Sequence, residues 1–130
     1  MPTTTARTTP HAAQLQRDRL YLLRPNFTDK GDGPFFCAEC ALVEGMLSFY
    51  PELRQKLDVT YVDFVRPRPQ IVAELGPEHQ SSPVLILGKV PANVPGTVEL
   101  KQANGKTFIN DEHGICNFLA ATYKLGRPHH

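Results

Sequence analysis

The stretch Phe36-Cys37-Ala38-Glu39-Cys40-Ala41-Leu42 decides how the sequence is interpreted, because it places two thiols three positions apart at the expected start of a helix. The backbone N–H groups of a first helical turn are unsatisfied, and the helix dipole adds positive potential there. Both effects favour a thiolate at Cys37. Cys40 lies one turn further along the same side, where it can attack a mixed disulfide on Cys37. The pattern predicts a nucleophilic thiol at Cys37 and a resolving thiol at Cys40.

Apolar runs and breaks on either side of this stretch predict an α/β fold. A buried strand precedes it, a loop over residues 25–34 leads into it, and the stripe of Leu42, Met46, Phe49, Leu53 and Leu57 continues its helix. We expect strands at 19–24, 59–64, 83–87 and 106–109, and helices at 37–57 (interrupted at Pro51), 69–75 and 111–123. The turn at 104–105 can pair the last strand with residues 97–101. This order predicts a parallel crossover unit, then a hairpin and a covering helix, in a four-stranded mixed sheet with helices on both faces.

Length and composition define the class of protein more than its activity. The chain of 130 residues is long enough for one domain, which we place at residues 19–130 behind a disordered tail at 1–18. A net charge of +1 argues against nucleic acid and acidic membranes as partners. No apolar run approaches the roughly 18–20 residues that span a bilayer. Three cysteines, an odd number, do not suit a disulfide-stapled secreted domain, so we expect a cytoplasmic protein.

Ser82-Pro83 is the second informative feature, because a proline at the start of a central strand has no N–H to donate to the sheet. A cis peptide bond at this point resolves the conflict and leaves the preceding backbone groups free for an extended ligand. Taken alone, Pro83 is more often an ordinary trans proline at a strand edge.

Together, the dithiol at a helix start, Pro83 opening a strand and the acidic turn at Asp111 resemble the thioredoxin fold, with glutaredoxins and the N-terminal domain of glutathione transferases the nearest in pattern. The chain also resembles a bacterial thioredoxin-like family of unknown function. That family has a Phe-Cys-x-x-Cys-Ala-Leu segment, an Arg-Pro-Arg-Pro segment and an Ile-Asn-Asp segment. These segments correspond here to residues 36–42, 66–69 and 109–111.

The resemblance implies a thiol–disulfide oxidoreductase whose substrate is a small thiol or disulfide or a protein disulfide. Glutathione would be a candidate co-substrate, and no cofactor or metal would be required. By this resemblance, Ser82 would hold the cysteinyl part of glutathione, and Asp111 with Glu112 would bind its γ-glutamyl amine. Capping of the last helix is the competing role of those two acids. The oligomeric state is left open.

Three further residues are candidates for binding the same ligand. Arg66 and Arg68 follow a strand and can meet a carboxylate or phosphate through two hydrogen bonds, unless they are exposed loop charges. Gln80 is a weaker candidate. Glu39 departs from the residues found between the cysteines of thioredoxins and glutaredoxins, and its charge should oppose a thiolate.

Two rival interpretations remain for the cysteine pair, besides simple packing in the core. One is a non-catalytic module that binds glutathione or a protein. The other is a zinc-holding domain in which His113 and Cys116 join Cys37 and Cys40. The 72 residues between Cys40 and His113 exceed the usual spacing of such sites. Cys116 otherwise fits a packed thiol on the last helix.

Overall fold

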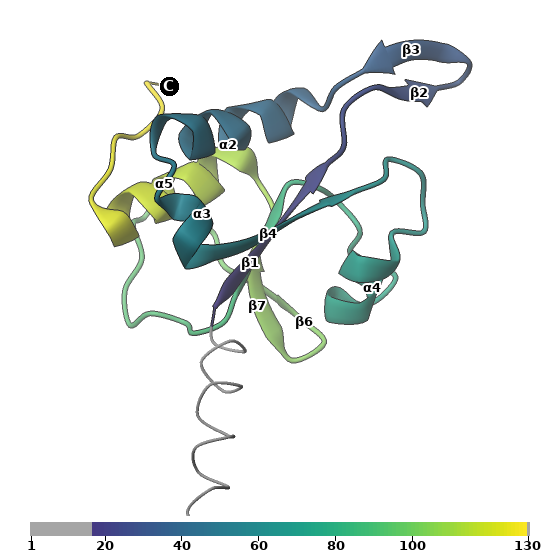
Figure 1. The fold of residues 1–130 in the computed structure, drawn as a ribbon. Coiled ribbons are helices and arrows are strands. Elements are labelled where there is room, and N and C mark those ends of the chain that lie inside the picture. Colours follow the sequence, from purple (N-terminus) through teal and green to yellow (C-terminus); the bar gives the residue numbers. More distant parts are fainter. Residues whose placement is uncertain (1–16, 130) are drawn as a thin grey trace, which may run out of the picture.

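The computed structural model describes residues 17–129, so the predicted tail over residues 1–18 lies almost wholly outside the described residues. A five-stranded mixed sheet forms the centre, in the order β4-β1-β5-β7-β6 (Figure 1). Its strands are β1 (Asp18–Leu23), β4 (Leu57–Val62), β5 (Val84–Leu87), β6 (Lys101–Ala103) and β7 (Lys106–Ile109). β1 pairs in parallel with β4 and antiparallel with β5, while β7 pairs antiparallel with both β5 and β6.

The mixed α/β architecture predicted from the sequence is confirmed, but the sheet has five strands and not four. The additional strand, β6, arises because Asn104 and Gly105 both have positive φ, at 53° and 74°, which produces a tight hairpin. This turn pairs β7 with Lys101–Ala103, so Lys101 is the one residue of the predicted partner segment 97–101 that lies in the strand. The parallel crossover from β1 to β4 agrees with the prediction, although β4 begins two residues earlier than expected.

Four helices lie within the described residues: α2 (Ala38–Phe49), α3 (Leu53–Lys56), α4 (Pro69–Leu75) and α5 (Glu112–Tyr123). Figure 1 shows α2 and α5 on one side of the sheet and α4 on the other. Pro51 separates α2 from α3, as expected for a residue that cannot continue a helix. Pro69 opens α4, and Gly76 ends it with a φ of 90°. Helices therefore cover both faces, and α2 starts beside the end of β1.

Residues 25–34, predicted as a loop, contain a hairpin of β2 (Phe27–Asp29) and β3 (Asp32–Phe35). The hairpin forms because Lys30 and Gly31 both adopt positive φ, at 52° and 78°, and join the strands through a two-residue turn. Lysine is uncommon in this conformation, so the sequence gives little warning of it. Figure 1 shows the hairpin projecting beyond the sheet, next to the start of α2.

The core lies between the sheet and the helices on its two faces. All four residues of β5 are buried, as expected for a central strand. On α2 the buried side chains are Cys40, Val43, Met46 and Leu47. Of the predicted stripe, Met46, Leu53 and Leu57 are buried as expected. Phe49, which the sequence pattern assigns to the core, is 80% exposed. The buried face of α2 therefore includes Cys40.

Candidate active site

Cys37 occupies the N-cap of α2, where the backbone is still extended, with φ −75° and ψ 115°. Its Sγ accepts a hydrogen bond from the N–H of Cys40 at 3.1 Å. A sulfur atom thus takes the role that serine or aspartate oxygens usually have at helix starts. The Cys37 side chain is half-buried and the thiol is free, so a reagent entering from solvent can reach it.

Cys40 lies one turn further into α2 and is only 5% exposed. Its Sγ accepts a hydrogen bond from the N–H of Leu23 at 3.5 Å, at the end of β1. The same sulfur lies 3.6 Å from the Oγ of Ser82. Like Cys37, Cys40 carries a free thiol. The two thiols therefore differ in access, with Cys37 facing the solvent and Cys40 packed against the sheet.

Ser82 contacts both sulfurs. The Cys37 thiol donates to the Ser82 carbonyl oxygen at 3.9 Å, and the Ser82 hydroxyl, near Cys40, donates to the carbonyl of Tyr21 at 3.0 Å. The Ser82-Pro83 peptide bond is cis, as predicted, and Pro83 is buried at the start of β5. The fold thus brings together four of the candidate residues, Cys37, Cys40, Ser82 and Pro83, which are separated by up to 46 positions in the sequence.

The electrostatic environment of Cys37 opposes ionisation. Burial raises the pKa of the Cys37 thiol to about 12, and its hydrogen bond and charge interaction with Cys40 and the charge of Glu39 act in the same direction. The Cys40 N–H acts in the opposite direction but is outweighed. The Cys37 thiol also donates to Glu39 Oε1 at 3.7 Å. The expected acidification by the helix start is therefore overcome, and Glu39 acts in the predicted direction.

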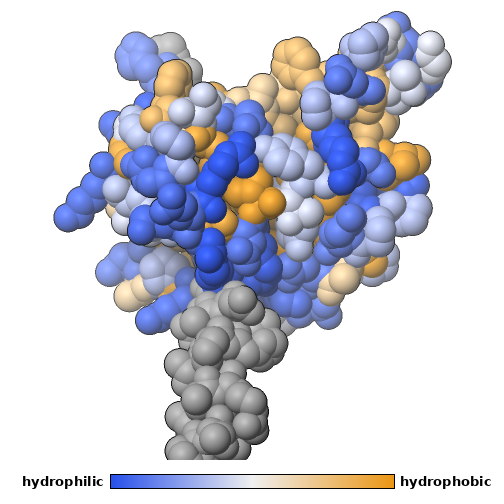
Figure 2. Space-filling view, in the orientation of Figure 1, coloured by the Kyte–Doolittle hydropathy of each residue, from blue (hydrophilic) through white to orange (hydrophobic). Residues whose placement is uncertain are grey.

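A cleft of about 390 Å³ opens beside Cys37, with an aromatic wall that the sequence analysis missed. The rings that line it are those of Phe27, Phe35, Phe36 and Phe64. Phe27 and Phe64 stack at 4.3 Å with their planes 5° apart, while Phe36 is 67% exposed. Figure 2 shows hydrophobic residues reaching the surface at the base of the hairpin. The two phenylalanines directly before Cys37 are the feature of the sequence that could have indicated this aromatic wall. A second hollow, of about 360 Å³, lies between α2 and residues 126–129 and contains neither sulfur.

Arg66 and Arg68 both line the cleft beside Cys37, but in different ways. Arg66 is exposed, whereas Arg68 is only 5% exposed and makes hydrogen bonds to backbone carbonyls. Its Nε and Nη2 donate to the Phe64 carbonyl at 3.0 and 2.6 Å, and its Nη1 donates to the Gln80 carbonyl at 2.7 Å. The Gln80 side chain accepts from the Arg68 N–H at 2.8 Å. Arg68 and Gln80 thus tie together the two segments that border the cleft.

Asp111 and Glu112 do not line the cleft. Asp111 Oδ2 accepts a hydrogen bond from the Gly114 N–H at 2.7 Å and caps α5, which is the competing role weighed for it. Glu112 lies 3.5 Å from His113 Nδ1. Their expected contact with a γ-glutamyl amine therefore stays a prediction, because neither acid lines the cleft that holds the other candidate residues.

The zinc alternative requires four residues that the fold does not bring together. Within residues 17–129, no group of three or more His, Cys, Asp or Glu side chains is close enough to hold a metal ion. Cys116 is fully buried on α5, as expected for a packed thiol. Burial, together with the charges of Glu112 and Asp111, raises the pKa of the Cys116 thiol to about 12. Cys116 is thus a core residue apart from the dithiol.

Comparisons with known proteins give one match. The model of a family described as a protein of unknown function (DUF3088) matches residues 17–127. Searches of curated proteins and of solved structures found no match. In the described part of the chain, no helix combines the length and apolar character needed to cross a membrane. Because the family model covers most of the 130 residues, the chain belongs to the DUF3088 family.

Proposed function

We propose that this protein is a thioredoxin-like thiol–disulfide oxidoreductase that uses Cys37 as the nucleophile and Cys40 as the resolving thiol. One observation carries the proposal: an accessible and a buried thiol, one helical turn apart, both contact Ser82 beside an open cleft. The parallel β1–β4 pair, antiparallel β5 and β7, and helices on both faces also suit a thioredoxin-like arrangement. A packed structural pair would need neither the cleft nor the partly accessible sulfur of Cys37.

The reaction proceeds by two exchanges. The Cys37 thiolate attacks one sulfur of a substrate disulfide, so that a Cys37–substrate disulfide forms and the second substrate sulfur leaves as a thiolate, which takes a proton from solvent. Cys40 then loses its proton and attacks Cys37 Sγ, which forms the Cys37–Cys40 disulfide and releases the first substrate sulfur. Two protein thiols are oxidised and one substrate disulfide is reduced. A low-molecular-weight thiol, with glutathione as the candidate, returns the protein to the dithiol.

The high pKa of Cys37 supports electron transfer from the protein dithiol to the substrate disulfide. A strongly oxidising dithiol protein owes its potential to a stabilised thiolate in the reduced form. Here burial and Glu39 disfavour that thiolate, so the disulfide form is relatively favoured and the protein tends to donate electrons. We therefore propose a reductase of small or protein disulfides that works in a reducing compartment such as the cytoplasm, where its own disulfide is transient.

The test is turnover of a small mixed disulfide in the presence of glutathione and a glutathione-recycling system. The wild-type protein should turn over, and Cys37→Ser should lose activity by at least 1,000-fold, roughly the loss found on removing a nucleophile. Cys116→Ser is the matched control, because it removes a thiol remote from Ser82 and should retain activity. Wild-type protein that reduces neither small disulfides nor a protein disulfide contradicts the proposal.

One feature favours the non-catalytic alternative: burial raises the pKa of the Cys37 thiol, which disfavours the thiolate that exchange requires. A binding module would hold glutathione in the cleft without exchange. Calorimetric titration of the Cys37→Ser, Cys40→Ser double variant with glutathione separates the two functions. Binding by an inactive wild type and by this double variant alike would favour the module.

A further inference from the structure

Arg68 carries a charge that no acid in the described residues neutralises. It is 5% exposed, and its guanidinium donates only to the carbonyl oxygens of Phe64 and Gln80. The ion pairs of residues 17–129 involve other cations. The Phe64 ring lies 5.7 Å from the guanidinium carbon. A buried charge without a counter-charge is costly, and such groups are usually paired.

The surroundings of Arg68 contain few charges that could be its partner. The same cleft is lined by Asp29 from β2, Glu39 from α2 and Arg66 from the loop after β4, and all three are exposed. Arg66 repels Arg68 and adds to the effect of burial, which lowers the pKa of the guanidinium. Ionised Cys37 and Cys40 act in the opposite direction and favour the charged arginine. Cys37 lines the same cleft as Arg68. The two sulfurs interact electrostatically with Arg68 and gain a negative charge during the proposed reaction.

We propose that Arg68 is the resident counter-ion of the dithiol, a positioning residue that stabilises each thiolate as it forms on Cys37 or Cys40. This inference rests on the proposed function. The guanidinium is held by carbonyls on both segments that border the cleft, so its charge is fixed before the sulfur ionises. Preorganised charge of this kind stabilises a developing anion without the cost of reorienting solvent. The thiol state leaves Arg68 uncompensated, and each thiolate intermediate supplies the missing partner.

The primary test measures alkylation of Cys37 by iodoacetamide as a function of pH, followed by mass spectrometry of the Cys37 peptide. Below the pKa, the rate reports the thiolate fraction. Arg68→Met should slow alkylation about tenfold at pH 8, equivalent to about one pKa unit for the loss of a nearby opposite charge. Arg68→Lys retains the charge and should remain within about threefold of wild type. Gln80→Met removes the two side-chain hydrogen bonds of Gln80, from the Arg68 N–H and to the Pro77 carbonyl, but no charge, and should also remain near wild type.

Two outcomes overturn the proposal. One is an unchanged rate in Arg68→Met. The other is an equal loss in Arg68→Met, Arg68→Lys and Gln80→Met, which would assign the effect to loop position and not to charge. Alkylation needs no disulfide substrate, so this result is independent of turnover. A protein that fails the turnover assay but shows the charge-dependent rate would lack the proposed function and still have the counter-ion.

A second experiment keeps Arg68 intact and places a permanent anion at the sulfur position. Cys37→Asp and Cys37→Asn both supply an N-cap, and they differ only in charge. If Arg68 supplies a counter-charge, the aspartate variant should melt a few degrees higher than the asparagine variant at pH 7. Asp111→Asn gives the matched control, because it makes the same exchange at the N-cap of α5, away from the cleft. An aspartate advantage at position 37 no larger than that at position 111 overturns the proposal.

Discussion

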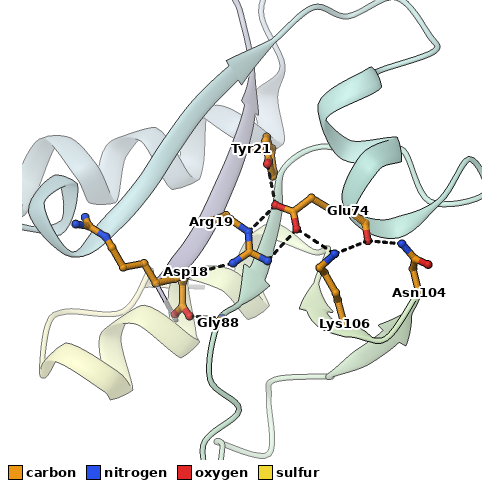
Figure 3. A network of polar contacts seen from close by, with 8 residues as sticks. Asp18, Arg19, Tyr21, Glu74, Gly88, Asn104 and Lys106 are labelled. Atoms are coloured by element: carbon orange, nitrogen blue, oxygen red, sulfur yellow. Dashed lines mark hydrogen bonds and ion pairs between the residues drawn. The ribbon is translucent and has the colours of Figure 1, made fainter. Parts of the chain in front are cut away.

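Two arginines in this molecule are held in opposite ways. Arg19 on β1 donates to both carboxylate oxygens of Glu74, one of them at 2.8 Å, and this carboxylate also accepts from Tyr21 Oη at 2.9 Å (Figure 3). Lys106 Nζ lies 3.6 Å from the same carboxylate. Arg68 is more deeply buried, and within residues 17–129 its guanidinium has only carbonyl oxygens as hydrogen-bond acceptors. The difference separates a charge that is neutralised within the fold from a charge that is left uncompensated beside the two sulfurs.

The two arginines act on opposite ends of α4. Arg68 is the N-cap of this helix, and Glu74 lies in its last turn. Glu74 contacts β1 through Arg19 and Tyr21 and the β6–β7 hairpin through Lys106 and Asn104, whose side chain donates to the Glu74 carbonyl at 3.0 Å. Figure 3 shows Glu74 between these two groups of side chains. The paired network therefore anchors the helix whose other end presents Arg68 to the cleft.

Glu74→Gln should give the largest change in stability. The amide keeps the size of the side chain but removes the carboxylate with which Arg19 and Lys106 form ion pairs, at a cost of about 2–3 kcal/mol in the free energy of unfolding for a partly buried network. Asp29→Asn is the matched change in the cleft, where no acid pairs with Arg68, and should alter stability by less than about 0.5 kcal/mol. Urea unfolding measures both. Equal losses would show that Arg68 has an acidic partner in Asp29 after all.

Acid should weaken the Glu74 network selectively. Burial alone would raise the pKa of Glu74, but the hydrogen bonds from Arg19 and Tyr21 and the charges of Arg19 and Lys106 hold it below its ordinary value of 4.5. A lowered carboxyl pKa contributes stability that is present above the unfolded-state pKa and is lost as pH falls through the folded-state pKa.

The difference in unfolding free energy between wild type and Glu74→Gln should therefore be constant from pH 8 to pH 6 and shrink by about 1 kcal/mol or more below pH 4. Urea titrations of both proteins across this range provide the measurement. If the difference in unfolding free energy stays constant to pH 3, the ionised form of Glu74 does not supply the stability of this network.

How far the sequence could predict these features depends on how local they are. Cys37 and Cys40 follow from a short pattern, and the turn at Asn104-Gly105 follows from residue type. The proline at a strand start raises the cis bond at Pro83 as one of two alternatives. The pairing of Arg19 with Glu74 joins residues 55 positions apart and has no local signal. The hydrogen bonds of Arg68 span only 4 and 12 positions but also have no recognisable pattern. The sequence context allows either a ligand-binding arginine or an exposed loop charge there. The hairpin β2–β3 depends on Lys30 in a conformation that lysine seldom adopts.

The smallest expected effect concerns Glu39, the acid that contacts Cys37 without pairing with Arg68. Its charge adds to the burial that raises the pKa of the Cys37 thiol, but the side chain is exposed and solvent screens it. Glu39→Gln should therefore speed alkylation of Cys37 at pH 8 by about two- to fourfold, a change of roughly half a pKa unit. Glu52→Gln, an exposed acid at the start of α3, should leave the rate unchanged. Slower alkylation in Glu39→Gln would reverse the interpretation. Glu39 would then act as a base that accepts the Cys37 proton across the 3.7 Å contact, and Arg68 would stabilise the sulfur left behind.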